Sequence, residues 1–139
     1  MEKLEHIGIA VRDLTRANET FARLLGKSHY KIEDVESEGV RTSFFQVGDL
    51  KIELLQASNA DSPIQKFIDK KGEGLHHIAF QVADVAKSLQ TCQENGFVAV
   101  NDSPKKGADN KLICFLHPKS TGGVLIELCE EINGAASSH

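Results

Sequence analysis

The sequence lacks both a membrane-crossing segment and a block of like charge. No stretch of about eighteen apolar residues runs uninterrupted, and the opening MEKLEHIGIAVRDL has no basic segment followed by a long apolar one. The formal net charge is -4, without a run of five like charges, so neither nucleic acid nor an anionic membrane is an expected partner. We therefore expect a soluble, cytoplasmic protein.

Cysteines are few and widely spaced, at Cys92, Cys114 and Cys129. An odd number without a C-x-x-C pair indicates neither a disulfide framework nor a thiolate zinc site. We expect the three thiols to be reduced and packed. The composition, 40% hydrophobic and 26% charged over 139 residues, fits one compact domain or two small modules that share a core.

The chain contains an internal repeat. LEHIGIAVRDL, residues 4–14, aligns with LHHIAFQVADV, residues 75–85, with five of eleven positions identical. A helical pattern follows each copy, with Asp13 and Asp84 as candidate N-caps and Gly26 and Gly96 as candidate ends. Three more short strands are then expected in each half, at residues 28–35, 40–47 and 50–56, and at residues 97–102, 111–117 and 124–130.

This pattern predicts an α+β protein made of two repeated strand-helix-strand-strand-strand (βαβββ) modules. The expected single domain, residues 1–139, divides into a first module at 4–57, a connector helix at 58–74, a second module at 75–130 and a tail at 131–139. Ser62 and Pro63 favour the start of the connector helix, and Gly72 its end. The small, polar tail is expected to be disordered.

Alternation along the first strand of each module separates one histidine from the aliphatic residues that pack under the helix. The aliphatic faces carry Ile7, Ile9 and Val11 in the first copy, and Ile78, Phe80 and Val82 in the second. The opposite faces carry Leu4, His6, Gly8 and Ala10, and His77, Ala79 and Gln81. His77 therefore matches His6 in register and facing, while His76 is expected to be a partly exposed bystander.

The last strand of each module holds one glutamate among aliphatic residues. Glu53 in LKIELLQ and Glu127 in VLIELCE face away from their aliphatic neighbours. A carboxylate in such a place costs several kcal/mol to bury unpaired, so each needs a cation. Two histidines and two glutamates on one face form a coherent ligand set for a divalent ion, with positions left open for water or substrate.

Several motifs resemble those of the methylmalonyl-CoA epimerase family, within the vicinal oxygen chelate superfamily that also holds glyoxalase I. They are LEHIGIAV, ELLQ, DSPIQKFIDKKGEGLHHIAF and FLHPKSTGGVLIEL, and the likeness covers residues 4–130. The resemblance implies an eight-stranded mixed sheet curled around a metal cavity, and a homodimer. By motif match, His6, His77 and Glu127 take three metal-ligand places. Glu53 takes the fourth, where some members carry Gln.

The resemblance also implies an activity, the interconversion of (R)- and (S)-methylmalonyl-CoA in propionate metabolism. The implied cofactor is a divalent metal ion, with Co2+ favoured and Mn2+, Ni2+, Zn2+ or Mg2+ as other candidates. Glu127 is the expected base, and Glu53 or a water the second proton carrier. Some family members carry a catalytic glutamate three residues after the glycine of a GV segment. This chain has Thr42 there, which cannot act as a base near neutral pH.

Two glycine-containing loops add candidate substrate-binding residues. SPKKGADNK holds Lys105 and Lys106, and HPKSTGG holds Lys119 and Ser120. Cationic loops of this kind bind the phosphates or the carboxylate of a CoA thioester. Surface loops often hold lysine and glycine without binding anything, so this expectation depends on the family match.

Three other functions are compatible with the same sequence. A glyoxalase I-like lactoylglutathione lyase would turn over a glutathione hemithioacetal with the same metal, and would not act on the CoA thioester. A metal-free small-molecule binding protein of the same fold has no need of all four polar positions and would purify without metal. A structural dimerisation domain would leave the cavity-facing glutamates unexplained.

Overall fold

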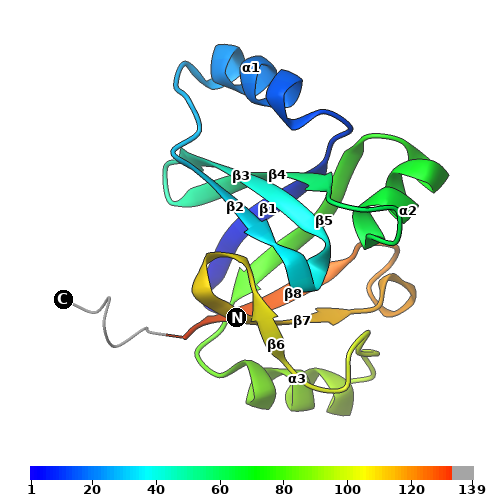
Figure 1. Cartoon of the computed structure of the whole chain (residues 1–139). Coiled ribbons are helices and arrows are strands. Elements are labelled where there is room, and N and C mark those ends of the chain that lie inside the picture. The colour runs from blue at the N-terminus through cyan, green and yellow to red at the C-terminus, as the bar shows by residue number, and fades with distance from the viewer. Residues whose placement is uncertain (133–139) are drawn as a thin grey trace. The chain divides into compact units, whose positions relative to one another are not determined.

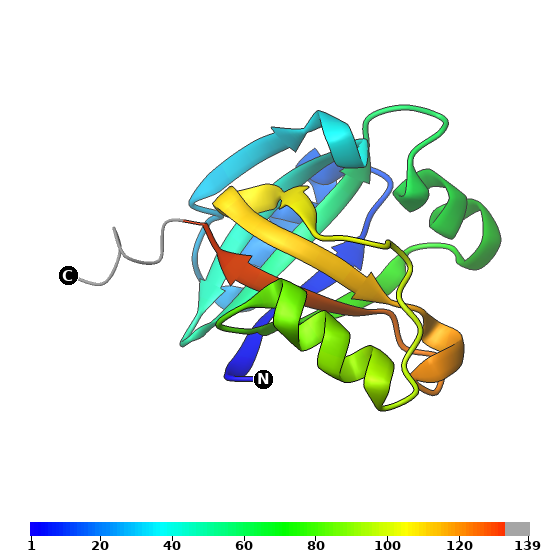
Figure 2. The same ribbon diagram turned by 90° about the horizontal axis from the view of Figure 1, so that it is seen from below.

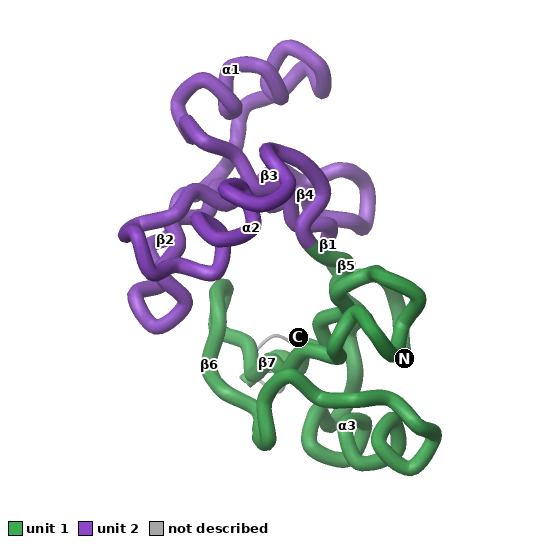
Figure 3. The backbone as a smooth tube through the Cα atoms, turned by 90° about the vertical axis from the view of Figure 1, so that its right-hand side faces the viewer, with its two compact units in different colours: residues 1–5, 77–139 green, residues 6–76 purple. Residues whose placement is uncertain are grey.

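The computed structural model describes residues 1–132, so the predicted tail lies outside the described residues from position 133 onward. The chain forms two compact units (Figure 3). Residues 6–76 make up one unit, and residues 1–5 with those from 77 onward make up the other. Among residues 1–132, none of the helices combines the length and the apolar character that a bilayer span requires.

Each half contains a βαβββ module, which confirms the predicted repeat (Figure 1). The first module comprises β1 (Lys3–Ala10), α1 (Leu14–Leu25), β2 (Lys31–Val35), β3 (Val40–Val47) and β4 (Leu50–Ala57). The connector helix is α2 (Pro63–Lys71). The second module comprises β5 (Gly74–Gln81), α3 (Val85–Glu94), β6 (Lys105–Gly107), β7 (Lys111–Leu116) and β8 (Ile126–Glu131).

The eight strands form one mixed sheet in which the order of the first four strands matches that of the last four. The order is β2-β3-β4-β1 in the first half and, read from the other edge, β6-β7-β8-β5 in the second. β1 pairs with β4 and β5 with β8 in parallel, while the other pairs within each half are antiparallel. The first and last strands of each module are therefore neighbours, which brings the histidine of the first strand close to the glutamate of the last strand in the same module.

The predicted N-caps begin the helices, and Gly26 and Gly72 end α1 and α2, but the C-cap of α3 is Asn95 rather than the predicted Gly96. Asp13 and Asp84 each accept a hydrogen bond from the backbone N–H three residues later, at 3.1 Å in both cases. Gly26 ends α1 in the left-handed conformation, with φ of 73°. Ser62 caps α2 by accepting from the Ile64 N–H at 3.1 Å. The two modules thus use the same local signal to turn from the first strand into the helix.

Each module helix packs on one face of its own part of the sheet. In the first module Val11, Leu14, Phe45 and Leu54 form the buried core, with Ile9 packed against it. In the second module Val82, Val85, Leu89 and Leu128 do so together with Cys114 and Leu116. Figure 2 shows α3 lying against β8 and β7. Ile9, Val11, Phe80 and Val82 of the predicted aliphatic faces lie in these clusters, so the opposite face of each module carries its histidine and glutamate.

One predicted strand was wrong. The sixth strand is Lys105–Gly107, and residues 97–102 make only an isolated bridge from Ala99 to Leu116. Both segments pair with β7, but the intervening NDSP, residues 101–104, interrupts the pairing. Turn-forming residues and a proline without an N–H favour such a break. Smaller differences are the start of β2 at Lys31 rather than residue 28, and the bounds of β8, Ile126–Glu131 rather than 124–130.

Candidate functional site

The first candidate pair lies on β1 and β4. Nδ1 of His6 is 3.2 Å from Oε2 of Glu53, and both side chains are about 95% buried. Gly8 stands directly opposite Glu53 in the parallel register, so His6, two residues earlier on the same face, is the diagonal neighbour of Glu53. The glycine opposite the carboxylate leaves room for the imidazole to reach it.

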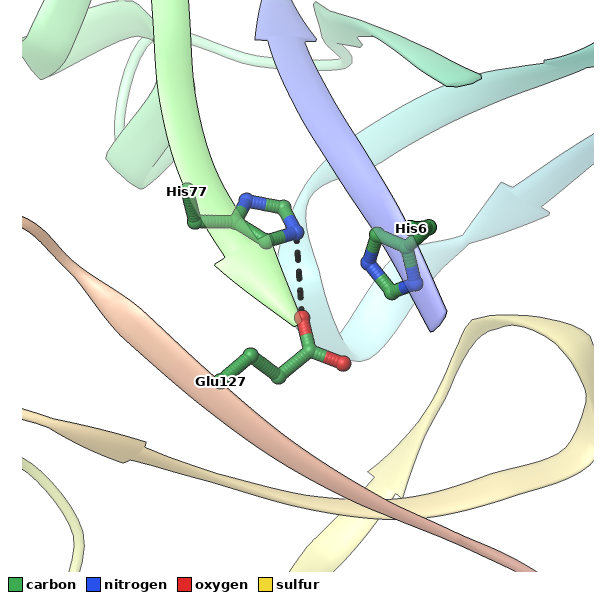
Figure 4. Close-up of side chains that lie close together, drawn as sticks. All are labelled: His6, His77 and Glu127. Carbon is green, nitrogen blue, oxygen red and sulfur yellow. Dashed lines mark ion pairs between the residues drawn. The ribbon is translucent and has the colours of Figure 1, made fainter. Parts of the chain in front are cut away.

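The second candidate pair repeats this arrangement on β5 and β8. Nε2 of His77 is 3.1 Å from Oε1 of Glu127, an ion pair drawn as a dashed line in Figure 4. Ala79 stands directly opposite Glu127. A small residue therefore again faces the glutamate, and the histidine two residues earlier is its diagonal neighbour. The edge of the His77 ring also contacts Phe115, with centroids 5.9 Å apart. The same pair in the same register in both modules is what the repeat predicted.

Each pair fits a metal ion by its chemistry. Histidine nitrogen and carboxylate oxygen are the donors that Co2+, Zn2+ and related ions accept. Both carboxylates are almost completely buried, where an ionised group is costly unless positive charge lies beside it. A neutral imidazole supplies a donor atom but no charge, so a divalent ion compensates each buried carboxylate better than the histidine alone.

The sequence did not predict a second buried ionic cluster. The Lys111 ammonium lies 3.8 Å from Oε2 of Glu5 and 3.8 Å from Oε1 of Glu131. Glu5 and Lys111 are both buried. Lys111 and Glu131 are direct register partners on β7 and β8, so this contact follows from the sheet. Glu5 is far from both in sequence, and no local pattern pointed to its pairing.

The loop residues predicted to bind substrate occupy two short segments of the second unit. Lys105 and Lys106 are consecutive residues of β6, so their side chains leave opposite faces of that strand. Lys119 and Ser120 lie in a single 3-10 turn, Pro118–Ser120. Ser120 Oγ accepts from the Val98 N–H at 3.0 Å and donates to the His117 carbonyl at 2.9 Å. Ser120 therefore anchors its loop, and substrate binding by the four residues stays a prediction.

Two further predictions concern His76 and the cysteines. His76 is partly exposed and packs edge-on against Phe67 of α2, with ring centroids 5.0 Å apart, as expected of a bystander. All three cysteines are free thiols. Cys114 and Cys129 are buried, whereas Cys92 is only partly so. Burial, reinforced by the nearby Cys92 and Glu127, raises the pKa of the Cys114 thiol to about 12, so it is unreactive near neutral pH.

Comparison with known proteins gives consistent matches over most of the chain. Residues 5–115 match the Glyoxalase/Bleomycin resistance protein/Dioxygenase superfamily. A Bacillus subtilis protein named uncharacterized protein YqjC is 40% identical, covering 100% of this chain and 99% of its own. The ethylmalonyl-CoA/methylmalonyl-CoA epimerase of Cereibacter sphaeroides is 37% identical, covering 91% of this chain and 96% of its own.

A solved structure extends the likeness to three dimensions. It is a variant of Streptomyces coelicolor methylmalonyl-CoA epimerase in complex with 2-nitronate-propionyl-CoA. The two chains share 34% sequence identity and superpose with a TM-score of 0.91 over 96% of each. Similarity at this level extends across both modules rather than one.

Proposed function

This chain belongs to the Glyoxalase/Bleomycin resistance protein/Dioxygenase superfamily, and we propose that it is an epimerase that interconverts (R)- and (S)-methylmalonyl-CoA. The observation that carries the proposal is the buried His–Glu pair that recurs in the same register in both modules. Relatives similar over nearly the whole chain are named epimerases of this substrate. The reaction needs a site that makes the proton on the central carbon of the substrate easier to remove. A metal ion held by such histidine and glutamate donors has this effect.

Following the resemblance, His6, His77 and Glu127 are proposed as three ligands of one divalent ion. Glu53, paired with His6, completes the set of four. When bound, such an ion withdraws electron density from the thioester and carboxylate oxygens of a substrate and so favours loss of the intervening proton. Cobalt stays a prediction from the resemblance.

Within this site Glu127 is assigned as the base. It takes the proton from the carbon between the thioester and the carboxylate, and the electron pair of the broken C–H bond remains on the substrate as an enediolate. A positioned carboxylate contributes about 10²- to 10⁴-fold to such a step. Return of a proton to the opposite face of the carbon inverts its configuration. Glu53 or a water is the second proton carrier.

Other parts of the proposal extend beyond the two His–Glu pairs. They are the contact of Lys105, Lys106, Lys119 and Ser120 with the CoA portion, the homodimer, the role in propionate metabolism and the cytoplasmic location. A cationic segment beside the site would complement the phosphates of CoA. The HPKSTGG segment, which contains the turn at Pro118–Ser120, leads towards β8 and hence towards Glu127, which makes it the stronger of the two candidate segments.

The proposal is tested by proton exchange at the reacting carbon. Purified, metal-reconstituted protein is incubated with methylmalonyl-CoA in deuterated water, with and without chelator, and deuterium at the central carbon is followed by mass spectrometry. Rapid, chelator-sensitive exchange with loss of stereochemical purity is the expected result. Absence of exchange above background with metal bound would refute the assigned substrate, and glutathione hemithioacetals would be the next substrates to assay.

A further inference from the structure

Strand β3 buries two consecutive hydroxyl groups, of which only one has a hydrogen-bond partner among the described residues. Thr42 and Ser43 are both completely inaccessible to solvent. Ser43 Oγ donates a hydrogen bond of 2.5 Å to Oδ1 of Asn18 on α1. Thr42 Oγ1 has no hydrogen-bond partner among the described residues. Buried hydroxyls are normally paired, and an unpaired one destabilises a fold, so this exception needs an explanation.

The register of the sheet places the unpaired hydroxyl on the same face as the candidate ligands. Phe44 is the direct cross-strand partner of Glu53, and partners in a register share a face of the sheet. Thr42, two residues before Phe44, lies on that face as well. Ser43 points to the other face, where its hydrogen bond to Asn18 ties β3 to the helix. Each hydroxyl therefore belongs to a different side of the same strand.

The surroundings of Thr42 offer little for its hydroxyl to bond with. Its neighbours on this face of β3 are Val40 and Phe44, and its register partner on β4 is Leu55. On its other side it faces Glu33 of β2, whose carboxylate lies 3.8 Å from the Lys31 ammonium. Valine has nearly the shape of threonine without the polar group, and would suit this apolar setting better if packing alone mattered.

We propose that Thr42 is a substrate-binding residue whose hydroxyl donates a hydrogen bond to a carboxylate or thioester oxygen of the bound acyl-CoA. This inference rests on the proposed function, because it assigns the substrate of that function as the missing partner. A hydroxyl whose own proton is lost only far above neutral pH donates well but removes no proton from carbon. Thr42 therefore holds the substrate, and the proton transfers fall to other groups.

The experiment compares Thr42→Val with Ser43→Ala, two variants that remove neighbouring buried hydroxyls. The dissociation constant for methylmalonyl-CoA is measured by titration calorimetry on Co2+-loaded protein, and the unfolding midpoint by circular dichroism. Thr42→Val is expected to weaken binding about tenfold without lowering the midpoint. Ser43→Ala is expected to lower the midpoint by about 3 °C with binding unchanged. Thr42→Ser, which keeps the hydroxyl, is expected to restore binding to within about twofold of the original.

Several outcomes would overturn the inference. Unchanged affinity in Thr42→Val would show that the substrate does not bond to the hydroxyl, and a midpoint lowered as much as in Ser43→Ala would show a structural role. Unchanged affinity together with loss of exchange for one stereoisomer would instead place Thr42 in the proton path.

The same measurements separate this inference from the proposed function. A protein that binds methylmalonyl-CoA without exchanging its proton would refute the epimerase alone, and the affinity of Thr42→Val would still decide the role of the hydroxyl. A protein that does not bind the thioester would refute both.

Discussion

If one ion joins both His–Glu pairs, then removing either histidine abolishes most of the stabilisation that the metal provides. His6 belongs to one compact unit and His77 to the other. His6→Ala and His77→Ala each remove a single nitrogen donor and leave the opposite pair intact. The quantity to compare is the metal-dependent shift of the unfolding midpoint within each variant, because this difference cancels the cost of truncating a buried ring.

The size of the shift follows from binding linkage. At a free metal concentration 100 times the dissociation constant, an ion that binds only the folded state stabilises it by about 2.7 kcal/mol. In a chain of 139 residues, each kcal/mol moves the midpoint by about 3 °C, which gives a shift of about 8 °C. Loss of a ligand that weakens binding about 100-fold leaves about 0.4 kcal/mol at the same metal concentration, or about 1 °C.

The assay is thermal unfolding followed by far-ultraviolet circular dichroism, with Co2+ and with excess chelator. His76→Ala serves as the matched control, because His76 is adjacent to His77 but partly exposed and packed on Phe67. We expect the control to keep the full shift. If each single variant kept about half of the shift, each pair would bind its own ion, and the shared site would be refuted.

Three other predictions test the site and the fold. Glu127→Gln keeps the shape of the side chain but removes its basicity, so we expect proton exchange to fall by about 10²- to 10⁴-fold with the circular dichroism spectrum unchanged; normal exchange would exclude Glu127 as the base. Because burial raises the pKa of Cys114 to about 12, the folded protein keeps this thiol protonated at pH values where the unfolded chain ionises it. Stability is therefore expected to be full below about pH 8.5 and to fall as the pH rises towards 12. Iodoacetamide at pH 8 should leave Cys114 unmodified until the protein unfolds, and peptide mass mapping that finds it alkylated in the native state would contradict its burial. Gly39 has a φ of 65°, and an added Cβ would lie 3.2 Å from Cβ of Ser62. Gly39→Ala is therefore expected to lower the free energy of unfolding, measured by urea titration, by about 1 to 2 kcal/mol. Unchanged stability would contradict this strain.

Local signals in the sequence were sufficient for the repeat and for most elements. The Asp13 and Asp84 caps, the alternation around His6 and the serine-proline start of α2 each act over a few residues, so each could be read directly. The segment at residues 97–102 was misassigned as a strand because its pairing depends on β7, a partner distant in sequence. Extended apolar residues signal that a strand can form, but they do not say where along a neighbouring edge the hydrogen bonds continue.

For the site, the sequence by itself determined the four candidate ligands, and the tertiary structure decided how each histidine meets the glutamate of its own module. Recurrence of one histidine and one glutamate in both modules was enough to single out the four candidate ligands. Only the parallel register placed Gly8 and Ala79 opposite the glutamates and brought each histidine within 3.2 Å of its partner. The tertiary structure also determined the buried cluster around Lys111 and left the hydroxyl of Thr42 unpaired. Burial and pairing depend on side chains contributed by distant strands, and no local pattern encodes them.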